Sequence, residues 1–324
     1  MRRLSRYQER VEELVADEVI RVEPLSRKKE VLAFVRSGLD DSSVSRSTAR
    51  ARGWGISVPG DPGQVVYVWF DALANYITAP GYGTDDAGYR YWWDGADERV
   101  HVIGKGIIRF HAVYWPAMLL SAGLRPPTTI FVHEYLIAGG EKISKSLGNA
   151  EDPADIVAAH GSDAVRWWLL REVARAGDTD YTAERLVARA NEDLANNIGN
   201  LVNRTATMIA KFGPAIGHDP RATDLRAARA EATGTIDRAL ADFDFRRAVE
   251  AVTRIATEAN RHIQTTKPWA LAKQGSPELP AVLGELLTTC REIADHLTPF
   301  LPAAAARIMA QCAGAPIAPV FLRL

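Results

Sequence analysis

The sequence has 324 residues, of which 47% are hydrophobic and 24% charged, as is ordinary for a globular chain of one or two domains. Its formal net charge of −1 argues against a protein that is basic throughout, as many nucleic-acid-binding proteins are, but leaves room for a local basic surface. The two cysteines have no CxxC spacing, which argues against a disulfide framework and a zinc site and favours a cytoplasmic location.

The first quarter of the chain predicts helices, a loop and a strand. Hydrophobic residues recur at helical spacing through residues 4–39, where Pro24 separates two predicted helices. Residues 40–63 predict a loop, because glycine and proline punctuate them. The β-branched and aromatic run of residues 65–69 predicts a buried strand, and residues 71–78 predict a helix.

The middle of the chain alternates strands with helices. Residues 100–103 and 129–133 predict short strands, and residues 107–121 predict a helix between them. This alternation is typical of a parallel sheet in an α/β fold. The most apolar stretch, residues 111–124, is too short to cross a bilayer, so no membrane segment is expected.

The last part of the chain predicts an all-α helix bundle. Gly139 and Gly140 predict a hairpin turn before it, and the pattern is almost wholly helical from Pro153 onward. Apolar residues keep a helical period through residues 245–263. Residues 213–234, rich in Ala, Gly, Asp and Arg, predict a mobile connection before a helix over residues 235–265.

A short lysine-containing loop is the first candidate site. Lys142 and Lys145 stand three residues apart with the hydroxyls of Ser144 and Ser146 beside them. Lysine ammonium groups can act as point charges on phosphate oxygens and stabilise charge on a departing pyrophosphate. The alternative is a solvated surface loop, which is the more frequent case for such a short pattern taken alone.

A second candidate site lies in the helical part. Asn200 and Arg204 are four residues apart, so they share one face of a predicted helix. Trp269 follows Pro268 at the start of another helix, where a rigidly held ring could stack on an unpaired base. An exposed polar helix face is the alternative interpretation of the first pair.

Three segments resemble the methionyl-tRNA synthetases, which are class I aminoacyl-tRNA synthetases. Residues 133–149 resemble the KMSKS segment of that family, with Ile143 in place of the usual methionine and Glu134 in place of the usual glycine. Residues 67–78 and 104–117 resemble segments around its amino-acid pocket. The resemblance implies a partial Rossmann-like parallel sheet with a KMSKS-type loop, followed by an anticodon-binding helix bundle.

The family's functional residues can be carried over position by position. A methionine side-chain pocket of aromatic and apolar groups suits a polarisable thioether, although Trp69 and Ile107 could also be plain core residues. Catalytic roles fall on Lys142 and Lys145. The implied methionine-binding residues are Trp69, Ala72, Leu73, Tyr76, Ile107 and His111. The implied ATP-binding residues are Lys142, Ser144, Lys145, Ser146, Gly104 and Arg46, and the implied anticodon-binding residues are Asn200, Arg204 and Trp269.

The sequence departs from the family at two points. Gly106 stands where the family has an aspartate that accepts hydrogen bonds from the ATP ribose, and loss of such an acceptor costs ~1.5–3 kcal/mol when the donor stays buried. The family's first half, with its HIGH motif and inserted domain, has no counterpart here. A parallel sheet binds ligand where its two halves meet, so activation chemistry is expected to need the other half.

These observations lead to one division of the chain and three functional hypotheses. We expect residues 1–135 to form the second half of the catalytic domain, residues 136–180 a linking segment with the lysine loop, and residues 181–324 the anticodon-binding bundle. The first hypothesis is an ATP- and magnesium-dependent ligase that joins methionine to tRNA(Met), either with a separate first half or as a fragment of a longer protein. The expected protein partner is that first half or a second copy of this chain. The others are a catalytically silent tRNA binder and a synthetase-like enzyme of small-molecule biosynthesis.

Overall fold

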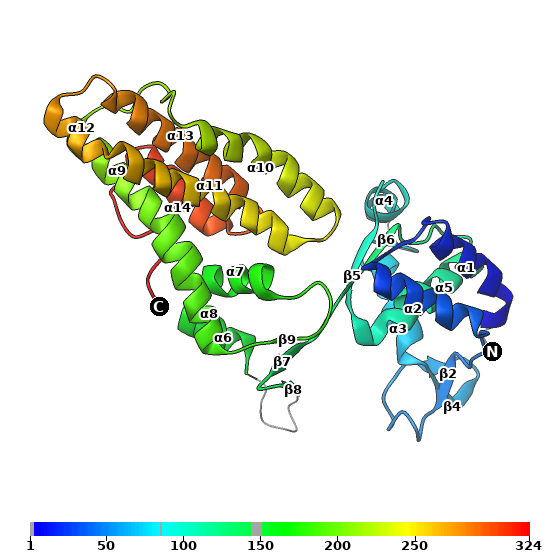
Figure 1. Ribbon diagram of the computed structural model, residues 1–324. Coiled ribbons are helices and arrows are strands. Elements are labelled where there is room, and N and C mark those ends of the chain that lie inside the picture. Colours follow the sequence, from blue (N-terminus) through cyan, green and yellow to red (C-terminus); the bar gives the residue numbers. More distant parts are fainter. Residues whose placement is uncertain (1–2, 85, 144–150) are drawn as a thin grey trace. The chain divides into compact units, whose positions relative to one another are not determined.

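The chain folds into two compact units, Met1–Tyr135 and Leu136–Leu324, each described here by itself (Figure 1). The computed structural model describes residues 3–84, 86–143 and 151–324. The first unit mixes sheets and helices, and the second is almost wholly helical. Within the three described ranges, no helix combines the length and the apolar character that a membrane span requires.

A three-stranded parallel sheet forms the centre of the first unit. Its strands are β1 (Arg21–Glu23), β6 (Thr129–His133) and β5 (Val100–Gly104), in the order β1-β6-β5. The structure confirms the two predicted strands, β5 and β6. The prediction for residues 4–39 missed β1, because a three-residue strand with a single buried side chain is too short to show a period.

Helices cover this sheet and bury its apolar side chains. The covering segments are the 3₁₀ turn η1 (Leu4–Tyr7), α1 (Gln8–Ala16) and α2 (Leu25–Arg36). Both predicted helices are therefore present, with β1 between them. The shared core is apolar and almost fully buried; it includes Val11, Leu14, Val15, Val22, Val31, Val35, Ile103, Ile130 and Val132.

A small antiparallel sheet replaces the loop predicted for residues 40–63. It consists of β2 (Ser45–Ser47), β4 (Asp61–Val66) and β3 (Ser57–Val58) in the order β2-β4-β3. The predicted strand over residues 65–69 was also wrong, because β4 ends at Val66 and belongs to this sheet. The helix α3 (Val68–Thr78) already begins at Val68, with the carboxylate of Asp71 in its positive first turn.

The helix predicted over residues 107–121 is built mainly from three short segments. These are the 3₁₀ turn η3 (Lys105–Ile107), the π-helical turn η4 (Phe110–Tyr114) and α5 (Trp115–Ser121). Pro116 has no amide hydrogen to donate to the preceding turn, which fits the wider hydrogen bonding there. The short segments α4 (Asp86–Tyr89) and η2 (Arg90–Asp94) precede β5.

The second unit begins with a hairpin. Its strands β7 (Leu136–Ala138) and β8 (Glu141–Lys142) are antiparallel, and β9 (Thr179–Asp180) pairs with β7 in parallel. The predicted turn is confirmed, because Gly139 and Gly140 have φ values of 63° and 79°, a left-handed geometry that favours glycine. The Gly140 amide donates to the Asp180 carboxylate over 3.2 Å, which ties the hairpin to β9.

Helices make up the rest of this unit. They are α6 (Pro153–His160), α7 (Ser162–Glu172), α8 (Ala183–Arg189), the π-helical segment η6 (Ala190–Gly199), α9 (Asn200–Phe212), α10 (Thr223–Ala241), α11 (Phe245–Thr266), α12 (Pro268–Gln274), α13 (Leu279–Leu297) and α14 (Pro302–Cys312). Helices α10, α11 and α13 run side by side, and α9 and α14 both pack against α13 (Figure 1). Their buried faces form the largest apolar core of the chain's described part.

The connection predicted for residues 213–234 was largely wrong. Helix α10 begins at Thr223, and the turn at Phe243, with φ of 54°, separates it from α11, so residues 235–265 are not one helix. The segment resembles a loop in sequence because its buried face is small and alanine-rich. That face nevertheless follows helical spacing and consists of Leu225, Ala228, Ala232, Ile236 and Ala239.

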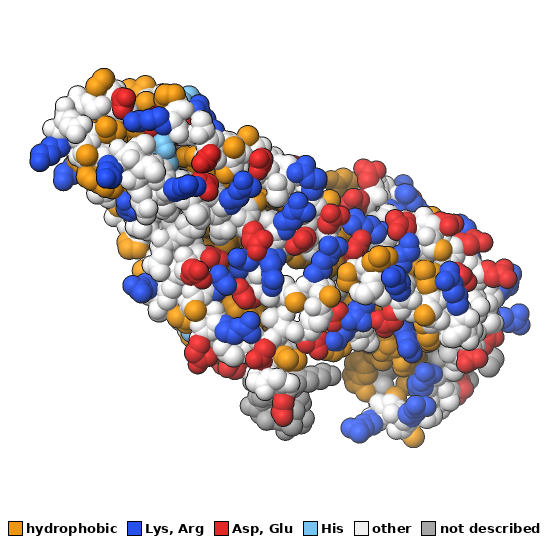
Figure 2. All heavy atoms as spheres, in the orientation of Figure 1, with side chains coloured by type: hydrophobic (Ala, Val, Ile, Leu, Met, Phe, Trp, Pro, Cys, Tyr) orange, Lys and Arg blue, Asp and Glu red, His pale blue; other side chains and the backbone are white. Residues whose placement is uncertain are grey.

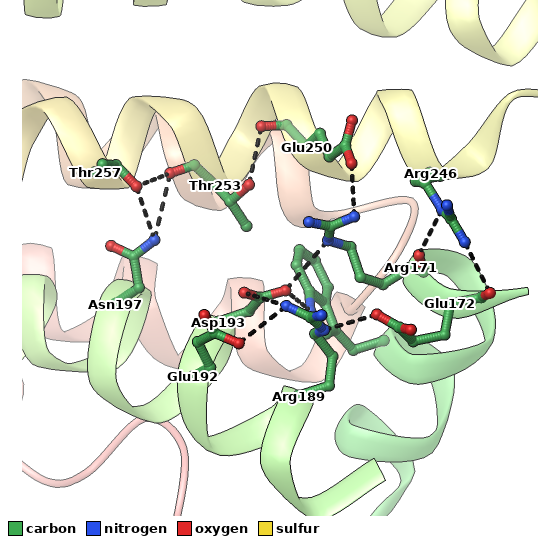
Figure 3. A network of polar contacts seen from close by, with 11 residues as sticks. Arg171, Glu172, Arg189, Glu192, Asp193, Asn197, Arg246, Glu250, Thr253 and Thr257 are labelled. Carbon is green, nitrogen blue, oxygen red and sulfur yellow. Dashed lines mark hydrogen bonds and ion pairs between the residues drawn. The ribbon is translucent and has the colours of Figure 1, made fainter. Parts of the chain in front are cut away.

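A polar network fastens α7 to the bundle. Arg171 pairs with Asp193 over 3.3 Å and with Glu250 of α11 over 2.6 Å (Figure 3). Arg189 pairs with Glu172 over 2.7 Å and with Asp193 over 3.5 Å. Because several charges share partners, the network can hold the helices that follow the lysine loop more firmly than an isolated surface pair would.

Candidate functional site

A hydrogen-bonded pair of side chains joins α3 to η4 in the first unit. The Tyr76 hydroxyl lies 2.9 Å from Nε2 of His111, and Nδ1 of His111 lies 3.0 Å from the Ile107 carbonyl. A carbonyl only accepts, so Nδ1 carries the proton and Nε2 accepts the Tyr76 hydroxyl hydrogen. Burial lowers the pKa of His111, which keeps this imidazole neutral.

Aromatic rings form an apolar wall beside this pair. Trp69 stacks on Phe110 with centroids 4.1 Å apart and meets the edge of His111 at 6.4 Å. The structure thus brings Trp69, Tyr76, Ile107 and His111 together. Among the other predicted pocket residues, Leu73 is buried in the apolar cluster beneath, whereas Ala72 is exposed on α3. Aromatic faces beside one neutral polar pair can hold a polarisable apolar side chain such as a thioether.

The prediction overlooked His101, which supports the pair from β5. It is 4% exposed, its ring lies 4.0 Å from that of Tyr76, and its Nε2 accepts the Trp115 indole hydrogen over 3.1 Å. Burial and the neighbouring His111 lower its pKa to about 3. The alternation of β5, which turns His101 and Ile103 to the same buried side, was the signal that could have identified it.

His101 makes the stability of the chain depend on pH. Its pKa falls from the ordinary histidine value of 6.5 to about 3 in the fold, so its contribution is complete above pH 6.5 and is lost as pH falls towards 3. We expect His101→Gln, which keeps an acceptor for Trp115, to reduce the loss of unfolding free energy between pH 7 and pH 5 by about 2 kcal/mol. Urea titrations at both pH values measure this difference, and equal losses in the variant and the native chain would contradict it.

Gly106 follows the carboxyl end of β5 in close contact with Tyr135. A Cβ atom at position 106 would overlap the hydroxyl oxygen of Tyr135 and lie 3.4 Å from its Cζ. Lys105 lies over the Tyr135 ring, 4.8 Å from its centroid. The glycine is therefore matched to the position of Tyr135, and an aspartate could not be introduced here without moving that ring.

This match predicts coupling between the two positions. Gly106→Asp is expected to destabilise the chain by roughly 1–3 kcal/mol, because the tyrosine ring must move. In the Tyr135→Phe background the oxygen is absent, so the same substitution should cost less. A double-mutant cycle by chemical unfolding measures the coupling, and additive effects would contradict the contact.

Glu134 is a buried, paired carboxylate. Its side chain is 3% exposed and pairs with Arg27 of α2 over 2.6 Å and with Lys105 over 3.1 Å. Two cations therefore neutralise the negative charge that the sequence places after β6. This carboxylate holds together α2 and the carboxyl ends of β5 and β6, the edge where parallel sheets bind ligands.

Two predicted ATP-site residues lie in separate parts of this unit. Gly104 ends β5 opposite His133 of β6, at the carboxyl edge of the parallel sheet. Arg46 lies in β2, where its guanidinium covers the Tyr67 ring at 3.9 Å and donates to the Ser45 carbonyl over 2.9 Å. The described contacts of Arg46 are thus with its own small sheet and with residues just outside its strands.

The lysine loop is described only in part. Lys142 is the last residue of β8, and its backbone pairs with Ile137. The predicted residues Ser144, Lys145 and Ser146 lie outside the described residues. The hairpin of β7 and β8 thus fixes the backbone at Lys142, where the lysine loop begins.

A groove of about 340 Å³ lies between α9 and α12 in the second unit. Arg204 and Trp269, predicted from segments far apart in the sequence, both line it. Asn200 is exposed one turn earlier on α9 and does not line it. The prediction missed residues one and two turns further along α9, which helical spacing from Arg204 could have suggested. The other lining residues are Asn203, Thr207, Met208, Lys211 and Phe212.

Trp269 is held at a sharp corner between α11 and α12. Lys267 has a left-handed φ of 46°, and the buried Pro268 starts α12. The hydroxyls of Thr265 and Thr266 both donate to the His262 carbonyl at the end of α11, over 3.0 and 2.7 Å. This fixed backbone presents Trp269, a residue that is 47% exposed.

Positive charge gathers near this groove. Figure 2 shows Lys and Arg side chains with few acidic ones around the end of the bundle where α12 lies. Along α11, by contrast, Arg254 pairs with Glu231 over 3.1 Å and Arg261 with Glu258 over 3.6 Å. The groove end is therefore better suited to bind an anion than the side of α11 that carries Arg254 and Arg261.

The described part of the chain offers no grouped metal ligands. Among residues 3–84, 86–143 and 151–324, no three His, Cys, Asp or Glu side chains lie close enough together to hold a metal ion.

The chain is similar to known proteins along almost its whole length. The family model "tRNA synthetases class I (M)" matches residues 1–206. A methionine–tRNA ligase of Rhizobium meliloti is 41% identical over 317 residues, which cover 95% of this chain and 60% of that protein. One of Fusobacterium nucleatum is 39% identical over 295 residues, covering 89% of this chain and 46% of that protein.

Solved structures agree with these relatives. The crystal structure of Mycobacterium tuberculosis methionyl-tRNA synthetase bound by methionyl-adenylate matches with a TM-score of 0.86 and 35% identity, over 98% of this chain and 65% of that one. Its apo form matches with a TM-score of 0.84 and 33% identity. The chain spans about 60% of the length of the Rhizobium relative. The family match, the sequence identity and the shared fold together show that this chain belongs to the class I methionyl-tRNA synthetase family.

Proposed function

We propose that this chain carries the methionine pocket, the lysine loop and the anticodon-reading surface of a methionine–tRNA ligase. The observation that carries the proposal is the arrangement of Tyr76, His111 and Trp69, a neutral polar pair beside an aromatic wall in a chain that is 41% identical to such a ligase. The chain acts in the cytoplasm together with a segment that corresponds to the part of its relatives that it does not span.

The proposed reaction has two steps. The methionine carboxylate attacks the α-phosphate of ATP and releases pyrophosphate, and the methionyl group then passes from the adenylate to the 3′ end of tRNA(Met). Lys142 and Lys145, with Ser144 and Ser146, contact the phosphates and stabilise the charge that builds on pyrophosphate. Gly104 and Arg46 complete the ATP site, and Mg²⁺ arrives on the ATP phosphates, as it commonly does.

The methionine side chain takes the apolar pocket. Its thioether lies against Trp69, with Ile107 and Ala72 as further apolar surface and the buried Leu73 beneath them. The Tyr76 hydroxyl donates its hydrogen bond to Nε2 of His111. Its oxygen can therefore still accept a hydrogen bond within the pocket.

The tRNA is read by the second unit. Trp269 stacks on an anticodon base, Arg204 contacts base or phosphate from the same groove, and Asn200 contacts the loop from one turn away. In this proposal residues 1–135 are the second half of the catalytic domain, residues 136–180 the linking segment with the lysine loop, and residues 181–324 the anticodon-binding bundle.

Methionine-dependent exchange of pyrophosphate into ATP tests the chemical step. The chain is mixed with the part of the Rhizobium relative that it does not cover, and Lys142→Ala controls for contaminating synthetase. The proposal predicts exchange that needs both parts and falls ~10²–10³-fold in the variant, as on loss of one transition-state donor. A mixture that is inactive, although both parts are folded and associated, would contradict it.

A second candidate function is tRNA binding without catalysis. The observation that favours it is Gly106, whose place against Tyr135 leaves no side chain where the family resemblance implies a ribose contact. In this case the chain would select a CAU anticodon, yet the mixture with the missing part would show no exchange. Equal affinity for tRNAs with and without that anticodon would exclude this candidate.

A further inference from the structure

The two cysteines of the chain lie together in the helix bundle of the second unit. Cys290 is in α13 and is fully buried, with 0% of its surface exposed, whereas Cys312 ends α14 and is half-buried. The two helices that carry them pack against each other, and both cysteines line one cavity. Two cysteines that are 22 positions apart in the sequence thus meet at one cavity, both as free thiols.

A cavity beside the two cysteines gives solutes access to the partly exposed Cys312. It measures about 470 Å³ and lies between α9, α13 and the end of α14. Both cysteines line it, together with mostly small or apolar neighbours such as Ala206, Ile209 and Ala315. A small uncharged oxidant can enter such a space, which is large compared with a water molecule.

The two sulfur atoms differ in reactivity. The hydrogen bond from Cys290 and the positive charge of Arg291, whose guanidinium also donates to the Cys312 carbonyl over 3.2 Å, lower the pKa of Cys312. The hydrogen bond with Cys312 and complete burial raise the pKa of Cys290. Cys312 is also the more exposed of the two, so it is the thiol that ionises and attacks the oxidant, and the buried Cys290 then attacks Cys312.

We propose that Cys290 and Cys312 form a reversible, peroxide-sensitive disulfide that cross-links α13 to α14. The Cys312 thiolate attacks one oxygen of hydrogen peroxide, which forms a sulfur–oxygen bond, breaks the oxygen–oxygen bond and releases water after protonation. The Cys290 sulfur then attacks the sulfenic sulfur, which forms the sulfur–sulfur bond and expels a second water with the Cys290 proton. Two thiols are oxidised and one peroxide is reduced to two waters.

The cross-link is expected to stabilise the bundle. The disulfide closes a loop of about 20 residues, which restricts the unfolded chain. The resulting increase in the free energy of unfolding corresponds to a rise of roughly 5–10 °C in the melting temperature of the second unit. A dithiol reductant should reverse it. This inference needs neither ATP nor tRNA and is independent of the proposed function.

Thiol counting on the native chain tests the inference. The protein is treated with hydrogen peroxide or with a dithiol reductant, unfolded in excess alkylating reagent and weighed by mass spectrometry. The expected result is two alkylated cysteines in the reduced sample and none in the oxidised one, with a peptide pair joined through Cys290 and Cys312 in the digest. Two alkylated cysteines after oxidation, or a cross-link between two chains, would overturn the inference.

Single variants assign the two roles. In Cys290→Ser, peroxide should leave Cys312 as a sulfenic acid that dimedone captures. In Cys312→Ser, peroxide should leave the buried Cys290 as a thiol that can be alkylated after unfolding. The melting temperature of neither variant should rise on oxidation. Capture of dimedone at Cys290 in Cys312→Ser would contradict the assigned order of attack.

Discussion

Trp269→Ala is expected to weaken binding of a tRNA with a CAU anticodon by roughly 5- to 150-fold, the loss of ~1–3 kcal/mol that follows removal of one stacked base. Trp269 is 47% exposed, stands on a corner fixed by Lys267 and Pro268, and shares its groove with Arg204. A ring held in this way needs little reordering when a base stacks on it, so most of the stacking energy contributes to binding.

Two variants control this measurement by equilibrium titration. Trp269→Phe keeps a flat ring and should recover most of the affinity. Met309→Ala removes another exposed apolar side chain from the same bundle, 40% exposed on α14, and should leave binding unchanged. A Trp269→Ala chain that is folded and binds the tRNA as tightly as the native chain would show that the groove is not the anticodon site.

Glu134→Gln is expected to lower the free energy of unfolding by about 2–4 kcal/mol. Removing one partner from a buried ion pair costs ~3–5 kcal/mol, and we reduce this figure because water reaches part of the two cations. The Glu134 side chain is 3% exposed, whereas those of Arg27 and Lys105 are 21% and 24% exposed. Glutamine keeps the shape of the side chain, so the effect reports the lost charge.

Glu30→Gln is the matched control. Glu30 also pairs with Arg27 over 2.6 Å, but its side chain is 40% exposed, so its loss should cost less than ~1 kcal/mol. Urea unfolding at neutral pH compares the two variants with the native chain. Equal costs at the two positions would contradict the view that burial makes the Glu134 pairs important.

The strands and helices show which parts of the fold a sequence can predict. Strands β5 and β6 were predicted because each is a short run rich in β-branched residues. The turn between β7 and β8 was predicted from Gly139 and Gly140. Strand β1 could not be predicted, because its only evidence is pairing with β6, more than a hundred positions away in the sequence. Helix α10 was missed because alanine gives a weak hydrophobic signal even where it is fully buried.

The candidate site also contains residues that the sequence could predict and contacts that it could not. Tyr76 and His111 could be placed together because each lies in a segment that resembles the methionyl-tRNA synthetases. No local pattern indicates that Glu134 pairs with Arg27, 107 positions away, or that Tyr135 fills the space beside Gly106. Such contacts depend on the approach of separate elements, which short segments do not encode by themselves.

Aminoacylation is the most direct test of the central claim that this chain forms the second part of a methionine–tRNA ligase. The native chain and the part of the Rhizobium relative that it does not span are combined with methionine, ATP, Mg²⁺ and tRNA(Met), and the charged tRNA is counted. We expect charging only when both parts are present, with loss of activity in Lys142→Ala and in Trp269→Ala. Charging that is independent of the native chain, or that survives both substitutions, would contradict the account.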